Sequence, residues 1–114
     1  MNVEFNLVNN KLIIRIDGDI DHHTCAEIRS KIDSEITRTN PKNIIFDMKN
    51  VSFMDSSGIG VVIGRYKLVM GKGGIAAMIN VKPQIKRVYD ICGLKKIIPI
   101  YENENQAIQN IKGV

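Results

Sequence analysis

The start of the chain alternates between apolar and polar residues, which predicts a β-hairpin. Residues 3–8 have the period of two that is typical of a half-buried strand, and residues 12–16 form a second apolar run. Asn9 and Asn10 separate the two runs, and asparagine tolerates the positive φ of a tight turn. We therefore expect two antiparallel strands joined by these two residues.

Beyond the hairpin, apolar residues recur at helical spacing, and short apolar runs separate these stretches. Ile28, Ile32 and Ile36 would form one stripe on a helix, and the spacing of Thr24 and Glu27 predicts a capping box at its start. Further helices are expected from Ser57 or Gly58 (buried face Ile59, Val62, Ile63, Tyr66, Val69, Met70), between Pro83 and Gly93 (buried face Ile85, Val88, Cys92) and over 107–111, with buried strands at 44–46, 75–79 and 97–100.

This order of elements predicts an α/β fold in a single domain over residues 1–114. Its sheet would be mixed, mainly parallel, opened by the hairpin and flanked by about four helices. In parallel βα units the loops that follow the strands emerge at one edge of the sheet. Two unusual loops, residues 19–24 and 50–57, are therefore expected to meet there.

The composition argues against a membrane protein, a secreted protein and a nucleic-acid-binding protein. A hydrophobic fraction of 44% and a charged fraction of 25% are typical of a globular protein, and no apolar run approaches the roughly 20 residues of a membrane span. The first residues lack the pattern of a signal peptide, so we expect a cytoplasmic protein without a membrane partner, monomeric when free. The net charge of +4 is spread over mixed positive and negative residues, which argues against nucleic-acid binding.

The sequence predicts neither a metal site nor a bound cofactor. Cys25 and Cys92 are far apart and are expected to be buried free thiols rather than a disulfide pair. His22, His23 and Cys25 are too close in sequence to converge easily on one zinc ion. The glycine-rich residues 71–74 lack the Gly-Lys-Ser/Thr ending of a phosphate-binding loop and are interpreted as a turn.

The segment around Ser56 is the most informative part of the sequence. Asp55, Ser56 and Ser57 precede a helix, where ordinary capping needs only one of them. A serine that is not needed for the cap would lie exposed where the helix dipole favours an anion. Gly60 and Gly64 follow one turn apart and are interpreted as sites where the helix packs closely, on the sheet inside the molecule or, as the alternative, on another chain.

A serine hydrolase is the alternative from another class. It would need a base beside the serine, and the only histidines, His22 and His23, lie on the neighbouring loop. The Gly-x-Ser-x-Gly motif of many hydrolases is absent. The sequence therefore favours a binding protein over an enzyme.

Several segments together resemble the STAS family and, within it, the antagonists of anti-sigma factors. They are residues 21–24 (Asp-His-His-Thr), 52–60 (Ser-Phe-Met-Asp-Ser-Ser-Gly-Ile-Gly) and 64–67 (Gly-Arg-Tyr-Lys), with Gly93 in a matching position. The resemblance covers nearly the whole chain and weakens after Tyr101. Asp-Ser-Ser-Gly alone would indicate only the wider family, whereas its combination with Asp-His-His is highly specific.

The resemblance implies a partner-switching regulator. Its unphosphorylated form would bind the anti-sigma F factor, a serine kinase, and release sigma F for sporulation transcription. The kinase would then phosphorylate Ser56 and end binding, and a serine phosphatase would reverse this step. The expected partner surface comprises Asp19, Asp21, His22, His23, Met54, Asp55, Ser57, Gly58 and Ile59. An antagonist from a stress-response sigma-factor switch remains the nearest alternative.

Overall fold

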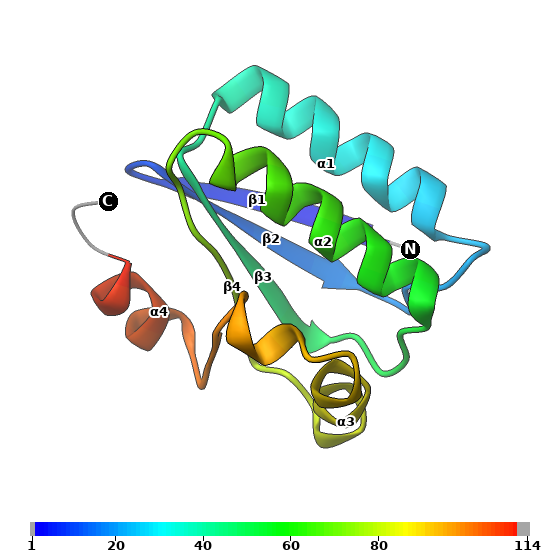
Figure 1. The fold of residues 1–114 in the computed structure, drawn as a ribbon. Coiled ribbons are helices and arrows are strands. Elements are labelled where there is room, and N and C mark those ends of the chain that lie inside the picture. The colour runs from blue at the N-terminus through cyan, green and yellow to red at the C-terminus, as the bar shows by residue number, and fades with distance from the viewer. Residues whose placement is uncertain (1, 112–114) are drawn as a thin grey trace.

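The computed structural model describes residues 2–111, which form one five-stranded sheet with helices on both faces (Figure 1). The strands are β1 (Asn2–Val8), β2 (Lys11–Asp17), β3 (Asn43–Asn50), β4 (Ala76–Ile79) and β5 (Ile100–Tyr101). The helices are α1 (Cys25–Thr39), α2 (Ser56–Met70), α3 (Pro83–Ile91) and α4 (Glu104–Asn110), with a 3₁₀ turn, η1 (Leu94–Lys96), before β5.

The strands lie in sequence order, β1-β2-β3-β4-β5, and only the first pair is antiparallel. Asn9 has a φ of 57°, which allows the tight turn between β1 and β2. The predicted hairpin and the predicted mixed, mainly parallel sheet with four helices are therefore confirmed in the described part of the chain.

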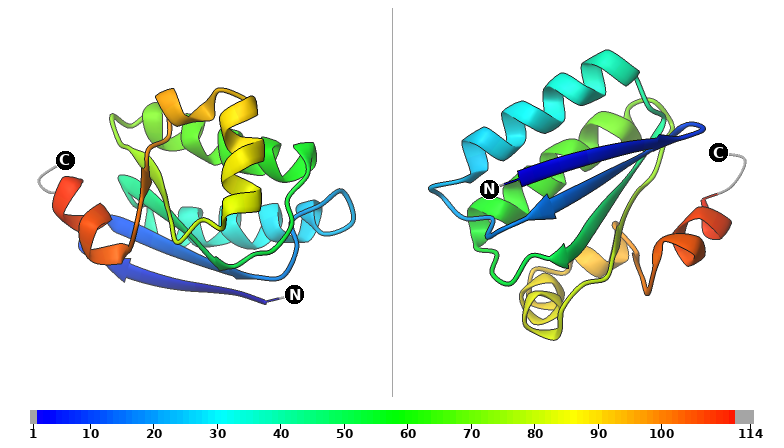
Figure 2. Two further views of the ribbon diagram at one scale, coloured as in Figure 1. Left: turned by 90° about the horizontal axis from the view of Figure 1, so that it is seen from below. Right: turned by 180° about the vertical axis from the view of Figure 1, so that it is seen from behind.

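The two faces of the sheet are covered unequally. Helices α1, α2 and α3 lie together on one side of the strands, and α4 stands apart from them (Figure 2). Alternate residues of β2 point to opposite faces, so Leu12 and Ile14 pack under the three helices, whereas Ile13 packs with Ala107 and Ile111 at the C-terminal end. The larger core thus lies beneath α1 and α2 and holds their N-terminal ends in place.

The capping box predicted at Thr24 is wrong. The Thr24 side chain makes no cap hydrogen bond to α1, and its hydroxyl donates to the Asp19 carbonyl at 2.8 Å instead. The Asp21 Oδ1 accepts from the N–H groups of His23 (2.9 Å) and Thr24 (3.1 Å), which both precede Cys25, the first residue of α1. Asp21 therefore fixes the loop that leads into α1.

The predicted stripe on α1 is confirmed, since Ile28, Ile32 and Ile36 are all buried. The other faces need correction in part. Met70 and Cys92 are exposed and Cys25 is half-buried, so the prediction of two buried thiols is wrong for both cysteines. On these helices the sequence analysis missed two buried hydrophobic residues, Val61 on α2 and Tyr89 on α3. The last strand begins later than predicted, at Ile100 after Pro99.

Gly60 and Gly64 do not mark close packing inside the molecule. A Cβ atom built on either residue has no heavy atom within 4 Å. The glycine of α2 that does allow a close approach is Gly58, in the first turn of the helix. The prediction of internal packing is therefore wrong for the first two residues. None of the helices within residues 2–111 is long and apolar enough to cross a membrane.

Candidate functional site

The loop before α1 and the loop before α2 lie side by side at one edge of the sheet, as predicted. The Ile20 N–H donates to the Phe53 carbonyl at 3.0 Å, and the Asp55 N–H donates back to the Ile20 carbonyl at 3.2 Å. Ile20 and Met54 thus form a short parallel bridge beyond the ends of β2 and β3. This bridge fixes the position of the first turn of α2 relative to the neighbouring loop.

Asp55 is the N-cap of α2 and also links the two loops. Its Oδ1 accepts from the N–H groups of Ser57 (2.8 Å) and Gly58 (3.3 Å), and its Oδ2 accepts from the His22 N–H at 3.2 Å. Partial desolvation acts to raise the pKa of this carboxyl, but the three N–H donors and the nearby His22 ring outweigh it and lower the pKa. Asp55 is therefore held as a carboxylate.

Ser56 is the first residue of α2, and its side chain is exposed. Because Asp55 supplies the cap, no hydrogen bond among the described residues uses the Ser56 hydroxyl. The first turn of α2 holds no acidic residue, so the positive end of the helix dipole remains available to an anion attached there. Asp55 already occupies two of the free amides, however, so an anion at Ser56 would rely mainly on the dipole.

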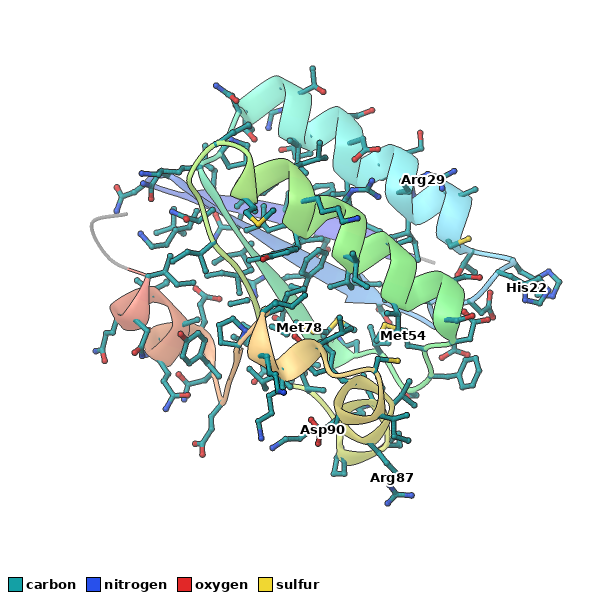
Figure 3. All side chains as sticks on the ribbon, viewed as in Figure 1. His22, Arg29, Met54, Met78, Arg87 and Asp90 are labelled. Atoms are coloured by element: carbon teal, nitrogen blue, oxygen red, sulfur yellow. The ribbon has the colours of Figure 1, made fainter. Side chains whose placement is uncertain are left out.

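The neighbouring loop carries several polar side chains. Asp19, His22 and His23 are exposed, and Asp21 is half-buried. The two imidazole rings lie 3.9 Å apart between centroids, and His22 projects into solvent from the loop (Figure 3). The His22 Nδ1 lies 3.8 Å from the Asp55 Oδ2, so the predicted residues of both loops do come together.

Three predicted partner-binding residues are not on the surface. Met54 and Ile59 are 3% and 6% exposed, and Gly58 is also buried. A Cβ atom on Gly58 would meet Met54 and Ile20, and Met54 and Ile59 belong to the same buried cluster as Ile20. This corrects the expectation of surface contact for these three residues, which support the site from below.

Phe53 is the surface residue that the sequence analysis missed. Its side chain is 53% exposed on the same loop as Ser56. The loop is fastened at its other side to α3, since the Lys82 Nζ donates to the Ser52 hydroxyl at 3.1 Å. An aromatic residue in the loop, two positions before the cap residue Asp55, was the available signal. Exposed aromatic side chains are common anchors at protein interfaces.

The arrangement does not support the enzymatic or metal alternatives. Within residues 2–111, no histidine side chain hydrogen-bonds to Ser56 or Ser57, and His22 faces Asp55 instead. The same residues contain no cluster of histidine, cysteine and acidic side chains that could hold a metal ion. The site consists of the exposed Ser56 hydroxyl and the carboxylate, imidazole and phenyl groups of the same two loops.

Replacing Asp55 with asparagine is expected to change how the unfolding free energy depends on pH, because asparagine cannot carry the negative charge of the cap. Because the folded-state pKa of Asp55 lies below its ordinary value of 3.8, the carboxylate stabilises the fold above that value and loses this effect as the pH falls through the folded pKa. The difference in unfolding free energy between the wild type and Asp55→Asn should be constant above roughly pH 5 and shrink below roughly pH 4. Urea unfolding at several pH values measures it; a difference unchanged down to roughly pH 3 would contradict the assignment.

Comparisons with known proteins agree with this geometry. The chain is 42% identical to the anti-sigma F factor antagonist of Paenibacillus polymyxa, over 100% of this chain and 99% of that protein. The solved structure of the anti-sigma factor antagonist SpoIIAA in its unphosphorylated form is 28% identical, covers 99% of this chain and 100% of its own, and has a TM-score of 0.76. The phosphorylated form of Bacillus SpoIIAA is 30% identical, covers 97% and 100%, and has a TM-score of 0.74. The family model of the STAS domain matches residues 2–107, and the chain therefore belongs to the STAS domain family.

Proposed function

We propose that this protein is an anti-sigma factor antagonist that is switched off by phosphorylation of Ser56. In the unphosphorylated state it binds the anti-sigma F factor, a serine kinase, and so releases sigma F. The observation that carries the proposal is that two different residues cap α2 and present a free hydroxyl at its start. Asp55 makes the cap, and Ser56 stands exposed beside it with no structural bond to lose. The 42% identity to an anti-sigma F factor antagonist supports the choice of sigma factor.

The partner surface in this proposal is centred on Ser56 and Phe53. Asp19, Asp21, His22 and His23 flank it from the loop before α1, with Asp55 and Ser57 beside the serine. The two loops are held by backbone hydrogen bonds and the Asp55 side chain, so the surface is formed before the partner arrives. A preformed surface loses little conformational entropy on binding.

The switching step is a phosphoryl transfer within the complex. The kinase moves the γ-phosphoryl group of its ATP to the Ser56 Oγ, the bond to the ADP leaving group breaks, and the hydroxyl proton passes to a base of the kinase. The product carries about 1.5 to 2 additional negative charges. A serine phosphatase hydrolyses the phosphoserine and restores the binder. In this role the protein acts as a monomeric cytoplasmic regulator and not as an enzyme.

Mass spectrometry after incubation with the anti-sigma F kinase and ATP tests this function. The wild type should gain one phosphate on Ser56, and Ser56→Ala should gain none while still binding the kinase. Ser57→Ala is the matched control and should be phosphorylated at Ser56. A phosphate placed on another residue, or capture only of a kinase from a stress-response switch, would contradict the proposal.

A further inference from the structure

A groove runs between α1 and α2 and begins beside the candidate site. It is lined by Cys25 and Arg29 from α1 and by Ser57, Gly60, Val61 and Arg65 from α2. Helices α1 and α2 lie side by side in the views of Figures 1 and 2, with Arg29 on the first half of α1 (Figure 3). Since Ser57 follows Ser56 directly, the groove opens next to the switching serine.

The groove holds two guanidinium groups with only one acidic partner between them. The Arg65 side chain is 11% exposed, and its Nε lies 3.1 Å from the Asp33 Oδ1. The Nε and Nη1 of Arg65 and the Asp33 Oδ1 are buried, and none of the three has a hydrogen-bond partner within residues 2–111, so the ion pair does not satisfy either side chain. Arg29 is exposed and forms no ion pair in the same part of the chain. Buried polar atoms without partners are rare and costly, and the guanidinium of Arg65 is therefore incompletely paired inside the molecule.

The electrostatics of Arg65 indicate the same deficit of negative charge. Burial lowers the pKa of its guanidinium, Asp33 acts in the opposite direction, and the positive charge of Arg29 lowers it further. The two cations therefore repel each other across the groove. An anion between them would relieve this repulsion and could accept hydrogen bonds in the forked geometry that arginine presents.

Gly60 leaves room for such a group in the groove. A Cβ atom there would meet no heavy atom within 4 Å, so nothing inside the molecule requires a glycine. Glycine lowers helix propensity relative to alanine. A group that approaches the helix backbone from outside would account for this residue.

We propose that this groove binds a carboxylate side chain of the protein partner, held by Arg29 and Arg65 between α1 and α2. This inference rests on the proposed function and deepens it, because it names the group that senses the switch. Ser56 precedes Arg65 by nine residues on α2, about 13 Å along the helix axis, so a phosphate on Ser56 would repel the bound carboxylate only through a partly screened interaction. The same contact that strengthens the unphosphorylated complex would therefore add to the weakening of the complex after phosphorylation.

Charge reversal at Arg29 tests the contact. Arg29→Glu should weaken binding of the anti-sigma kinase by at least 10-fold, measured by calorimetry, and Arg29→Lys should lie between this variant and the wild type. Lys31→Glu is the matched control, since it makes the same charge change on α1 outside the groove, and it should alter affinity less than about 2-fold. Equal affinities of Arg29→Glu and the wild type would overturn the inference, as would an equal loss in Lys31→Glu.

Substitution of the two glycines provides a second test that is independent of charge. Gly60→Ala and Gly64→Ala should both raise the melting temperature, because each side chain has free space. Only Gly60 lines the groove, so only Gly60→Ala should weaken partner binding. If the wild type fails to bind the kinase at all, the proposed function is wrong. If it binds and both glycine variants bind equally well, the groove is not part of the interface.

Discussion

Ser56→Asp is expected to lose partner binding almost completely while the domain keeps its fold and melting temperature. The new carboxylate would stand where the partner closes over the start of α2. Burying it there costs desolvation, and any acidic group of the partner would repel it. A combined loss of about 4 kcal/mol corresponds to roughly a thousandfold weaker complex.

The fold should tolerate this substitution because of what surrounds Ser56. The side chain is exposed, the cap is made by Asp55, and the first turn of α2 has no other acidic residue. A negative charge at that position interacts favourably with the helix dipole, by about 0.3 to 1 kcal/mol. The related protein SpoIIAA likewise matches this fold in both its unphosphorylated and its phosphorylated forms.

Calorimetric titration with the anti-sigma kinase and thermal unfolding measure the two halves of this prediction. Ser34→Asp serves as the control, since Ser34 is exposed on α1 away from the two loops, and it should bind like the wild type. Tight binding by Ser56→Asp would argue against a switch based on charge and desolvation. A large drop in melting temperature would show instead that Ser56 has a structural role.

The periodicity of apolar residues was sufficient to predict the types of element. The four-residue spacing of Ile28, Ile32 and Ile36 fits a helix, and the alternation in β1 fits a strand. Capping was harder to predict. Thr24 and Glu27 have the spacing of a capping box, but the Thr24 hydroxyl bonds to the Asp19 carbonyl, and the Asp21 carboxylate accepts from N–H groups of the loop before the helix. Residue spacing identifies side chains that could cap a helix. The path of the loop decides which hydrogen-bond partners these side chains meet.

The sequence predicted that two loops meet at the candidate site, but it did not predict which of their residues are exposed and which are buried. Ser56 and Gly58 are two residues apart, yet the first is exposed and the second is buried. Helical geometry turns neighbouring residues through about 100°, so one faces solvent and the other faces Ile20. Gly58 and Gly60 differ for the same reason, because only the first lies against another segment. Residue type alone cannot make that distinction.

Gly58→Ala is expected to destabilise the domain and to disrupt the site at the same time. A Cβ atom on Gly58 would lie 2.4 Å from the Met54 Cγ, 2.7 Å from the Ile20 carbonyl oxygen and 2.9 Å from the Ile20 Cγ2. The Ile20 carbonyl accepts the Asp55 N–H, so the methyl group would press directly on the bridge between the two loops. Overpacking of this kind costs about 1 to 3 kcal/mol.

Thermal unfolding should therefore give a lower melting temperature for Gly58→Ala, by roughly 4 °C for each kcal/mol lost. Gly64→Ala is the matched control on the same helix. It adds the same methyl group into free space and should be stabilised by about 1 kcal/mol through helix propensity. The opposite signs of the two substitutions isolate the steric contact from the effect of propensity. Partner affinity should fall for Gly58→Ala even at temperatures where the variant is fully folded, because the displaced bridge carries Asp55 and Ser56 with it. An unchanged melting temperature and affinity would mean that the two loops can separate without affecting the cap or the exposed serine.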